Sequence, residues 1–260
     1  MPLAARLAVA VQLAEEAGRL ALRLRPPPGA AAATLKGTQD WLTEADGAVE
    51  AFLSERLAAA FPEDGFQGEE TGSGRTGRLR WVVDPIDGTS NYARGGTRFC
   101  VSLGLIEDRT PLLGVIVAPA LGETFAARQG HGATLNGVAI RAAATADPAR
   151  AMVECGWSHR RSNESFFRLV EAVMGTGASL RAGGSGALGL ADVAAGRIDA
   201  YVELHINLWD VAAALAILAE AGAAVSPFMR DPGPSTGNPI LAAAPGVVDT
   251  LRAATGFTDL

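Results

Sequence analysis

The chain has 260 residues, of which 48% are hydrophobic and 19% are charged, and its formal net charge is −6. This length fits one two-part domain or two small domains, and the composition excludes a disordered chain, which would contain fewer apolar residues. The negative charge and the lack of a basic stripe with interleaved aromatic residues argue against a general nucleic-acid-binding protein. A protein of this charge that handles phosphate needs local positive potential, and bound cations are the obvious source.

Cysteine content and apolar runs exclude two further classes. The two cysteines, Cys100 and Cys155, are too few for a disulfide scaffold, and both lie in apolar runs. We therefore expect buried, reduced thiols in a cytoplasmic protein. The longest clean apolar run, residues 211–219, is far too short to cross a bilayer, so no membrane partner is expected.

The beginning of the chain predicts two helices. Leu and Val recur at helical spacing over residues 3–24, and this helix must stop before Pro26 because proline cannot continue the hydrogen-bond ladder. Residues 29–38 predict a loop or an irregular ribbon. A second helix is expected to begin near Thr43, where Asp46 stands in the position of a capping box and an apolar stripe of 3.6-residue periodicity follows.

Three strands are predicted next. Residues 79–83 form a short run with β-branched and aromatic side chains, which predicts a buried strand that ends at Asp84. Residues 99–106 and 112–117 predict two more strands. The link between them is short and contains turn-forming residues, so we expect a hairpin.

From about residue 150 the pattern alternates between strands and helices. Such alternation predicts a layered α/β half, whereas the first half is of α+β type. We therefore divide the chain near residue 145 into an α+β metal-binding, catalytic part, 1–145, and an α/β substrate-binding part, 146–260. The strands expected in the second part are 151–155, one near Leu180, 198–203 and 240–243, and the expected helices are 164–174, 187–195 and 211–221.

The sharpest motif is the hexapeptide DPIDGT, residues 84–89, directly after a predicted strand. Its two carboxylates, Asp84 and Asp87, point into one small volume, where they repel each other unless a cation lies between them. A helix that begins at Gly88 or Thr89 would offer backbone N–H groups to a phosphate. A capped strand-to-helix turn uses the same residue types, so the hexapeptide alone is compatible with both interpretations.

Two other acidic segments lie far from this motif in the sequence. Glu69 and Glu70 follow Gly68, and Asp210 follows Trp209 at the start of an almost uncharged run. Each is ordinary by itself, because adjacent carboxylates are usually solvated and an Asp at a helix N-terminus is usually a cap. Hard oxygen ligands from separate segments are nevertheless what a Mg²⁺ site requires.

The order and spacing of these motifs resemble the inositol monophosphatase family of lithium-sensitive, Mg²⁺-dependent phosphatases. The resemblance covers nearly the whole chain and extends to Lys36 and to Gly184-Ser185. It implies a layered α-β-α-β-α sandwich, a homodimer, and two to three Mg²⁺ ions for which Mn²⁺ can substitute. The motifs that carry it are Thr43-Glu44-Ala45-Asp46, Gly68-Glu69-Glu70, the hexapeptide 84–89 and Trp209-Asp210-Val211-Ala212-Ala213.

The same resemblance implies roles for individual residues. The metal ligands would be Glu69, Asp84, the backbone carbonyl of Ile86, Asp87 and Asp210. The attacking water would be oriented by Thr89 and Asp46, with Glu69 or Glu70 nearby. The residues that bind the substrate would be Asp87, Gly88, Thr89, Gly184, Ser185, Gly186, Glu203 and Asp210.

The side chains on the substrate side are open to two interpretations. Glu203 would accept hydrogen bonds from polyol hydroxyls, or it is a surface charge at a strand end. His205 is a half-buried packing residue or a substrate contact. The cluster His159-Arg160-Arg161 is a solvated loop or reaches the active site from a partner subunit. The histidines lack metal-ligand spacing, so zinc is not expected.

We therefore expect a Mg²⁺-dependent phosphomonoesterase in which a metal-activated water attacks inositol monophosphate or a related small polyol phosphate. Histidinol phosphate, fructose 1,6-bisphosphate and a bisphosphate nucleotide are alternative substrates for the same chemistry. A catalytically inactive regulatory protein on this fold is the alternative from another class, and the intact acidic set argues against it. Inhibition by Li⁺ follows from the resemblance.

Overall fold

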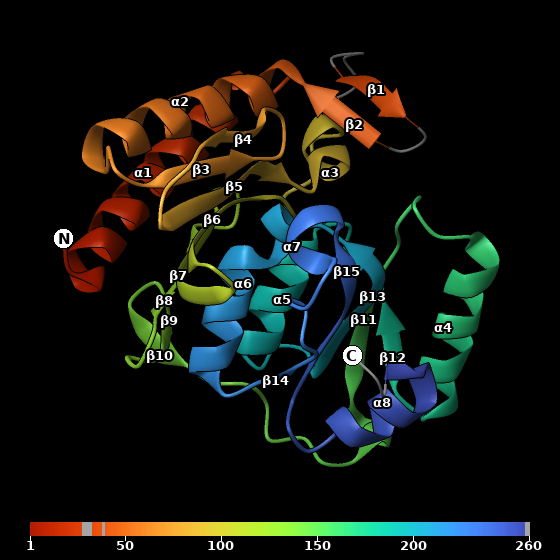
Figure 1. The fold of residues 1–260 in the computed structure, drawn as a ribbon. Coiled ribbons are helices and arrows are strands. Elements are labelled where there is room, and N and C mark those ends of the chain that lie inside the picture. The colour runs from red at the N-terminus through yellow and green to blue at the C-terminus, as the bar shows by residue number, and fades with distance from the viewer. Residues whose placement is uncertain (28–32, 38–39, 258–260) are drawn as a thin grey trace.

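The structure is a computed structural model that describes residues 1–27, 33–37 and 40–257, with side chains for residues 1–27 and 43–257. Its elements form five layers, in which helices alternate with two large sheets (Figure 1). The predicted α-β-α-β-α sandwich is therefore confirmed. Among the described helices, none combines the length and the apolar character that a bilayer crossing needs.

The first outer layer consists of α1 (Leu3–Leu24) and α2 (Glu44–Ala60), and both predicted helices are confirmed. In α2 the predicted capping box is present, because the Asp46 carboxylate accepts the backbone N–H of Thr43 at 2.8 Å and its hydroxyl at 2.6 Å. The face of α1 that packs on the first sheet is rich in alanine, which lets the helix approach closely: Ala10, Leu13, Ala14, Ala17 and Ala21.

The prediction of a loop or irregular ribbon over residues 29–38 is wrong for part of that range. Residues Ala33–Gly37 form the regular strand β1, which pairs antiparallel with β2 (Asp40–Thr43). Both segments contain β-branched, aromatic or large apolar residues, which favour a strand once a partner is adjacent. Residues 28–32 and 38–39, and the side chain of Lys36, lie outside the described parts.

The first large sheet has eight strands in the order β10-β9-β8-β7-β6-β5-β3-β4. Its centre is β5 (Leu79–Asp87), β6 (Cys100–Glu107) and β7 (Thr110–Ala118), which confirms the three predicted strands and the hairpin. β5 runs past the expected end at Asp84 because a register shift between Asp84 and Asp87 lets pairing resume. The remaining strands are β3 (Gly65–Gly68), β4 (Gly72–Arg75), β8 (Glu123–Arg128), β9 (Ala133–Leu135) and β10 (Val138–Ile140).

The second sheet lies on the other side of helices α5 and α6 from the first sheet. It has five strands in the order β12-β11-β13-β15-β14. Its outer face is covered by α4 (Asn163–Gly175) and α8 (Val248–Thr255). The predicted strands and the predicted helix on this side are confirmed within a few residues. The strands are β11 (Met152–Gly156), β12 (Ser179–Arg181), β13 (Ala200–Ile206), β14 (Ala224–Val225) and β15 (Asn238–Ala243).

The middle layer consists of α5 (Gly186–Ala194) and α6 (Leu208–Ala221), which pack between the two sheets. This position explains why α6 carries so few charges, since it is covered on both sides. The short helices α3 (Thr89–Ala93) and α7 (Gly233–Thr236) and a 3-10 turn (Pro148–Arg150) complete the described helical segments.

A pair of glycines sets how closely α6 approaches the first sheet. Gly104 on β6 lies opposite Gly114 on β7. A Cβ at Gly114 would lie 2.0 Å from the carbonyl oxygen of Ala213, and one at Gly104 would lie 2.7 Å from Ala212. The backbone of α6 therefore packs directly against the backbone of the sheet. This close packing fixes the distance between the first turn of α6 and the end of β5.

Candidate active site

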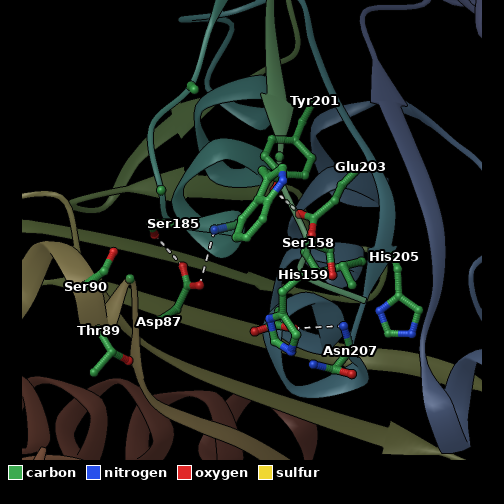
Figure 2. Close-up of a pocket in the computed structure, with 18 of the residues that line it drawn as sticks. Asp87, Thr89, Ser90, Ser158, His159, Ser185, Tyr201, Glu203, His205 and Asn207 are labelled. Carbon is green, nitrogen blue, oxygen red and sulfur yellow. Dashed lines mark hydrogen bonds between the residues drawn. The ribbon is translucent and has the colours of Figure 1, made fainter. Parts of the chain in front are cut away.

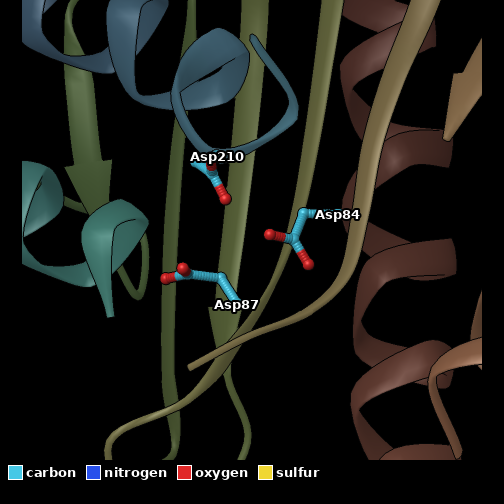
Figure 3. Close-up of side chains that lie close together, drawn as sticks. All are labelled: Asp84, Asp87 and Asp210. Atoms are coloured by element: carbon cyan, nitrogen blue, oxygen red, sulfur yellow. The ribbon is translucent and has the colours of Figure 1, made fainter. Parts of the chain in front are cut away.

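Three aspartates converge where β5 ends and α6 begins (Figure 3). One carboxylate oxygen from each of Asp84, Asp87 and Asp210 lies within 4.8 Å of the other two. Asp210 also accepts the backbone N–H of Asn207 at 2.8 Å, so it caps the first turn of α6 as well. The structure thus brings together three of the four predicted side-chain metal ligands.

Burial and mutual repulsion raise the pKa values of these carboxyls. The pKa of Asp84 is raised well above its ordinary value, first by burial and then by the charges of Glu69, Asp87 and Asp210. Burial, together with the charge of Asp87, raises the pKa of Asp210 to about 7. With pKa values raised in this way, the cluster retains a proton in the absence of cations, which relieves the repulsion between the carboxyls. Divalent cations would replace that proton, and an all-oxygen anionic donor set fits Mg²⁺ or Mn²⁺.

Glu69 lies beside the three aspartates. Its charge contributes to the raised pKa of Asp84, and it lines the cavity described below. The turn that carries it is held by Glu50 of α2, whose carboxylate accepts the backbone N–H groups of Glu70 at 2.8 Å and Thr71 at 2.9 Å. The Glu70 side chain is not among the residues that line the cavity. Glu50 was missed in the sequence because it resembles an ordinary charge on an amphipathic helix.

Thr89 and Asp46 form a second polar group next to the aspartates. Thr89 opens α3, as predicted, and its N-cap Gly88 has a φ of 86°, which favours glycine. The Thr89 hydroxyl lies 2.8 Å from the carbonyl oxygen of Ile86 and 3.3 Å from Oδ1 of Asp46. Since one O–H donates once, the nearer carbonyl accepts it and the buried Asp46 is the alternative acceptor.

Asp87 connects the first sheet to the start of α5 in the middle layer. The Ser185 hydroxyl donates to Asp87 Oδ2, and the backbone N–H groups of Gly186 and Ala187 donate to the same carboxylate at 3.2 and 2.9 Å (Figure 2). These are the first N–H groups of α5, which have no partner within their own helix. A predicted metal ligand from the first sheet therefore caps the helix that starts at two predicted substrate-binding residues.

A cavity of about 320 Å³ opens beside these groups. Figure 2 shows Asp87 and Thr89 on one side of it and Glu203 and His205 on the other. Every residue that was predicted to bind the substrate lines this cavity: Asp87, Gly88, Thr89, Gly184, Ser185, Gly186, Glu203 and Asp210.

Glu203 is a buried side chain rather than a surface charge. It is 8% exposed and accepts the Tyr201 hydroxyl at 2.5 Å. Burial raises the pKa of Glu203 to about 8. Tyr201 was not predicted as part of the site, since a tyrosine in an apolar strand reads as a core residue. Tyr201 and Glu203 thus form a polar part of the cavity lining that can bind hydroxyl groups of a substrate.

His205 is held by a backbone group. Its Nε2 lies 2.8 Å from the carbonyl oxygen of Thr236, so Nε2 donates and carries the proton. Burial lowers the pKa of His205, which keeps the ring neutral. The packing interpretation of His205 thus agrees with the structure, although the residue also lines the cavity.

A partly buried ring of ion pairs lies near the loop that leads into α5. Arg98 and Arg181 each bind both Glu154 and Asp192, with N···O distances of 2.7–2.8 Å. The two carboxylates are buried, at 1% and 8% exposed, whereas the arginines are 25% and 34% exposed, so the ring lies at the edge of the interior. Sequence reasoning missed it because its four members come from distant segments, where each reads as a solvated charge.

Asn91 ties the two sides of the cavity together. Its side-chain amide donates to the carbonyl oxygens of Arg98 at 2.8 Å and Gly183 at 2.9 Å. Asn91 lies on α3, two residues after Thr89, and Gly183 lies in the loop before Ser185. The group that orients water and the loop that borders the substrate are therefore fixed relative to each other.

We expect the metal-free protein to lose stability as the pH rises from about 4 to about 7. The pKa of Asp210 is raised from 3.8 to about 7, so in this window the folded state retains a proton that the unfolded chain has released, and the free energy of unfolding falls. Thermal unfolding at pH 5 and pH 8, with EDTA or with Mg²⁺, measures this. Mg²⁺ should raise Tm by several degrees more at pH 8 than at pH 5, and equal shifts at the two pH values would contradict the raised pKa of Asp210.

The comparisons with known proteins agree with this geometry. The Inositol monophosphatase family profile matches residues 3–255. A protein named Nus factor SuhB from Xylella fastidiosa is 38% identical over 237 residues, which cover 88% of this chain and 86% of that protein. An inositol-1-monophosphatase from Mesorhizobium japonicum is 36% identical over 230 residues, covering 87% and 86%.

A crystal structure supports the same placement. The extragenic suppressor protein suhB from Bartonella henselae matches with a TM-score of 0.88 at 31% identity, over 98% of this chain and 100% of that chain. A profile match over nearly the whole length, together with relatives above 30% identity, agrees with the resemblance seen in the sequence. The chain belongs to the inositol monophosphatase family.

Proposed function

We propose that this protein is a Mg²⁺-dependent phosphomonoesterase that hydrolyses inositol monophosphate or a related small polyol phosphate. The observation that carries the proposal is the convergence of Asp84, Asp87 and Asp210 next to the Thr89–Asp46 pair, beside one cavity. Family membership and the inositol-1-monophosphatase among the relatives support it. A homodimeric state, a cytoplasmic location and inhibition by Li⁺ belong to the same proposal.

Cations held by the three aspartates, with Glu69 and the Ile86 carbonyl as further ligands, would supply an acidified water and charge neutralisation at the leaving oxygen. Near that site, Thr89 Oγ1 accepts a proton from a water while its own proton passes to Asp46 Oδ1, 3.3 Å away. Backbone N–H groups at Gly88 and Thr89 bind the phosphate.

The opposite side of the cavity holds the leaving group. Tyr201 donates to one oxygen of Glu203, so the carboxyl presents its other oxygen to a substrate hydroxyl. The ring of the polyol lies between this pair and the loop Gly184-Ser185-Gly186, which Asp87 and Asn91 hold in place. Catalysis on this scheme depends on positioning and electrostatics, as phosphoryl transfer generally does.

Removing the Thr89 hydroxyl should slow turnover. We expect Thr89→Val, which keeps the shape of the side chain, to lower kcat by about 100-fold or more, because the proton path to Asp46 is lost. Thr89→Ser keeps the hydroxyl and should retain most of the activity. Steady-state kinetics of phosphate release measure kcat and KM separately; a Val variant with unchanged kcat would show that no proton passes through Thr89.

The function itself is tested by a phosphate-release panel. The substrates are inositol 1-phosphate, histidinol phosphate, fructose 1,6-bisphosphate and adenosine 3′,5′-bisphosphate, each with EDTA, Mg²⁺ or Mn²⁺. We expect release that requires a divalent cation and is fastest on a polyol phosphate. No release from any of these esters in the presence of Mg²⁺ would refute the proposal.

The names of the relatives favour a second candidate, a binding role of the kind named Nus factor. These names lend no support to the expectation that nucleic acid is not a partner. Such a role would not depend on catalysis, so it would persist in an Asp84→Asn variant that no longer releases phosphate. Binding of an RNA oligonucleotide to the wild type and to that variant separates the two candidates.

A further inference from the structure

The wall of the cavity beyond the aspartates is formed by residues 156–160, all of which line it. The segment starts where β11 ends at Gly156 and is pinned to the start of α4, because the indole N–H of Trp157 donates to Asn163 Oδ1 at 3.0 Å. The backbone N–H of Arg160 lies 3.4 Å from the Ser158 hydroxyl oxygen. The wall is thus a defined turn with its own contacts.

Arg160 supplies the permanent positive charge of this wall. Of the described residues that line the cavity it is the one Lys or Arg, and the other ionisable lining groups include five carboxyls: Glu69, Asp87, Glu154, Glu203 and Asp210. Burial raises the pKa of Glu203 and the charge of Arg160 acts in the opposite direction, in agreement with the position of both side chains on the same cavity.

The protein leaves this charge without a close anionic partner. Within the described side chains no carboxylate forms an ion pair with Arg160. Glu154 is committed to the ring with Arg98 and Arg181. The Glu203 carboxyl is bound to Tyr201, and its pKa near 8 leaves it largely protonated at neutral pH. Cations bound by the aspartates would offset the remaining negative charge on the other side.

We propose that Arg160 binds a second anionic group, a phosphate or a carboxylate, on the leaving part of the substrate. This rests on the proposed function and narrows it to polyol phosphates that carry another anion. A guanidinium presents a planar pair of N–H donors that fits either group. The neutral hydroxyls of the same molecule would face Glu203 and Tyr201.

The test compares kcat/KM of the wild type, Arg160→Ala, Arg160→Lys and Arg161→Ala on matched esters. Inositol 1-phosphate has a neutral leaving group, fructose 1,6-bisphosphate carries a second phosphate, and 6-phosphogluconate carries a carboxylate. Arg161 is the control, because its Nε donates to the carbonyl oxygen of Leu204 at 3.3 Å and it lines a different cavity.

We expect Arg160→Ala to lower kcat/KM on the anionic esters by about 10- to 100-fold, mainly through KM, and on inositol 1-phosphate by less than about 3-fold. Arg160→Lys should lie in between, and Arg161→Ala should resemble the wild type. The wild-type preference for an anionic ester should shrink as the salt concentration rises. Loss on one anionic ester alone identifies which group, phosphate or carboxylate, is recognised.

Equal losses on neutral and anionic esters in Arg160→Ala would overturn the proposal while the phosphatase function stands. If the wild type releases no phosphate at all, the proposed function fails, and calorimetry still decides on Arg160. Fructose 6-phosphate should then bind the wild type at least about 10-fold more tightly than Arg160→Ala. Equal affinity of the two proteins would refute an anion site at Arg160.

Discussion

Asp84→Asn is expected to lower kcat for phosphate release by at least about 1,000-fold. Asp84 is 1% exposed, accepts the backbone N–H of Ile86 at 2.9 Å and has a carboxylate oxygen within 4.8 Å of one on Asp210. Asparagine has the same size and can still accept that N–H, but it is neutral and a weaker ligand for a hard cation. Activity should therefore be lost while the fold is retained.

Stability provides the control for this variant. Because the substitution removes one of several repelling carboxylates, the metal-free Tm should not fall, and the rise in Tm on adding Mg²⁺ should be smaller than in the wild type. Asp249→Asn, on the exposed surface of α8, should leave both kcat and the Mg²⁺ effect unchanged. Near-normal kcat in Asp84→Asn at saturating Mg²⁺ would contradict the assignment of Asp84 as a metal ligand.

Gly114→Ala is the second substitution for which we expect a large effect. The new Cβ would lie 2.0 Å from the carbonyl oxygen of Ala213, which is backbone and cannot rotate away. The helix α6 must then move off the sheet, and Asp210 moves with it because it lies one turn before Ala213. We expect the free energy of unfolding to fall by about 1–3 kcal/mol.

Metal affinity should fall together with stability in this variant. The Mg²⁺ concentration for half-maximal activity should rise by about 10-fold, because a small displacement of Asp210 as a metal ligand has a large effect on metal binding and catalysis. Chemical denaturation and Mg²⁺ titration of phosphate release measure the two effects. Gly175→Ala, at the exposed end of α4 with no atom within 4 Å, is the matched control and should change neither. A Gly114→Ala protein with unaltered Mg²⁺ dependence would show that α6 does not need to sit this close.

The parts of the fold that could be predicted from the sequence are those set by local patterns. The helix over residues 3–24 follows from apolar periodicity and a proline stop, and β5 to β7 follow from apolar runs joined by a turn. β3, β4, β8, β9, β10 and β14 were missed. Apart from β8, which has six residues, these strands have two to four residues and acquire their hydrogen bonds from neighbours that the sequence does not identify. In such short segments the intrinsic strand propensity is too weak to determine whether a strand forms.

In the candidate site, too, the residues set by local patterns could be predicted and those that depend on distant partners could not. Asp84 and Asp87 were predictable because their spacing at a strand end already places them together, and Asp210 joined them through the order of motifs. Glu50 and the ring around Glu154 were not predictable, because a charged residue in the sequence does not disclose a partner from another segment. The attachment of Asp87 to α5 was hidden for the same reason.

The hydrogen bonds between Asp87 and the start of α5 also influence how the folding protein acquires its ability to bind divalent ions. The opening turn of α5 receives its acceptor from β5 in the adjacent layer, so this turn is incomplete until α5 has packed on the first sheet. A chain in which α5 and α6 had not yet packed on the first sheet would have neither a finished α5 nor a gathered set of oxygens. Affinity for divalent ions should therefore emerge only when these helices pack on the first sheet, and loosening of that contact would abolish it.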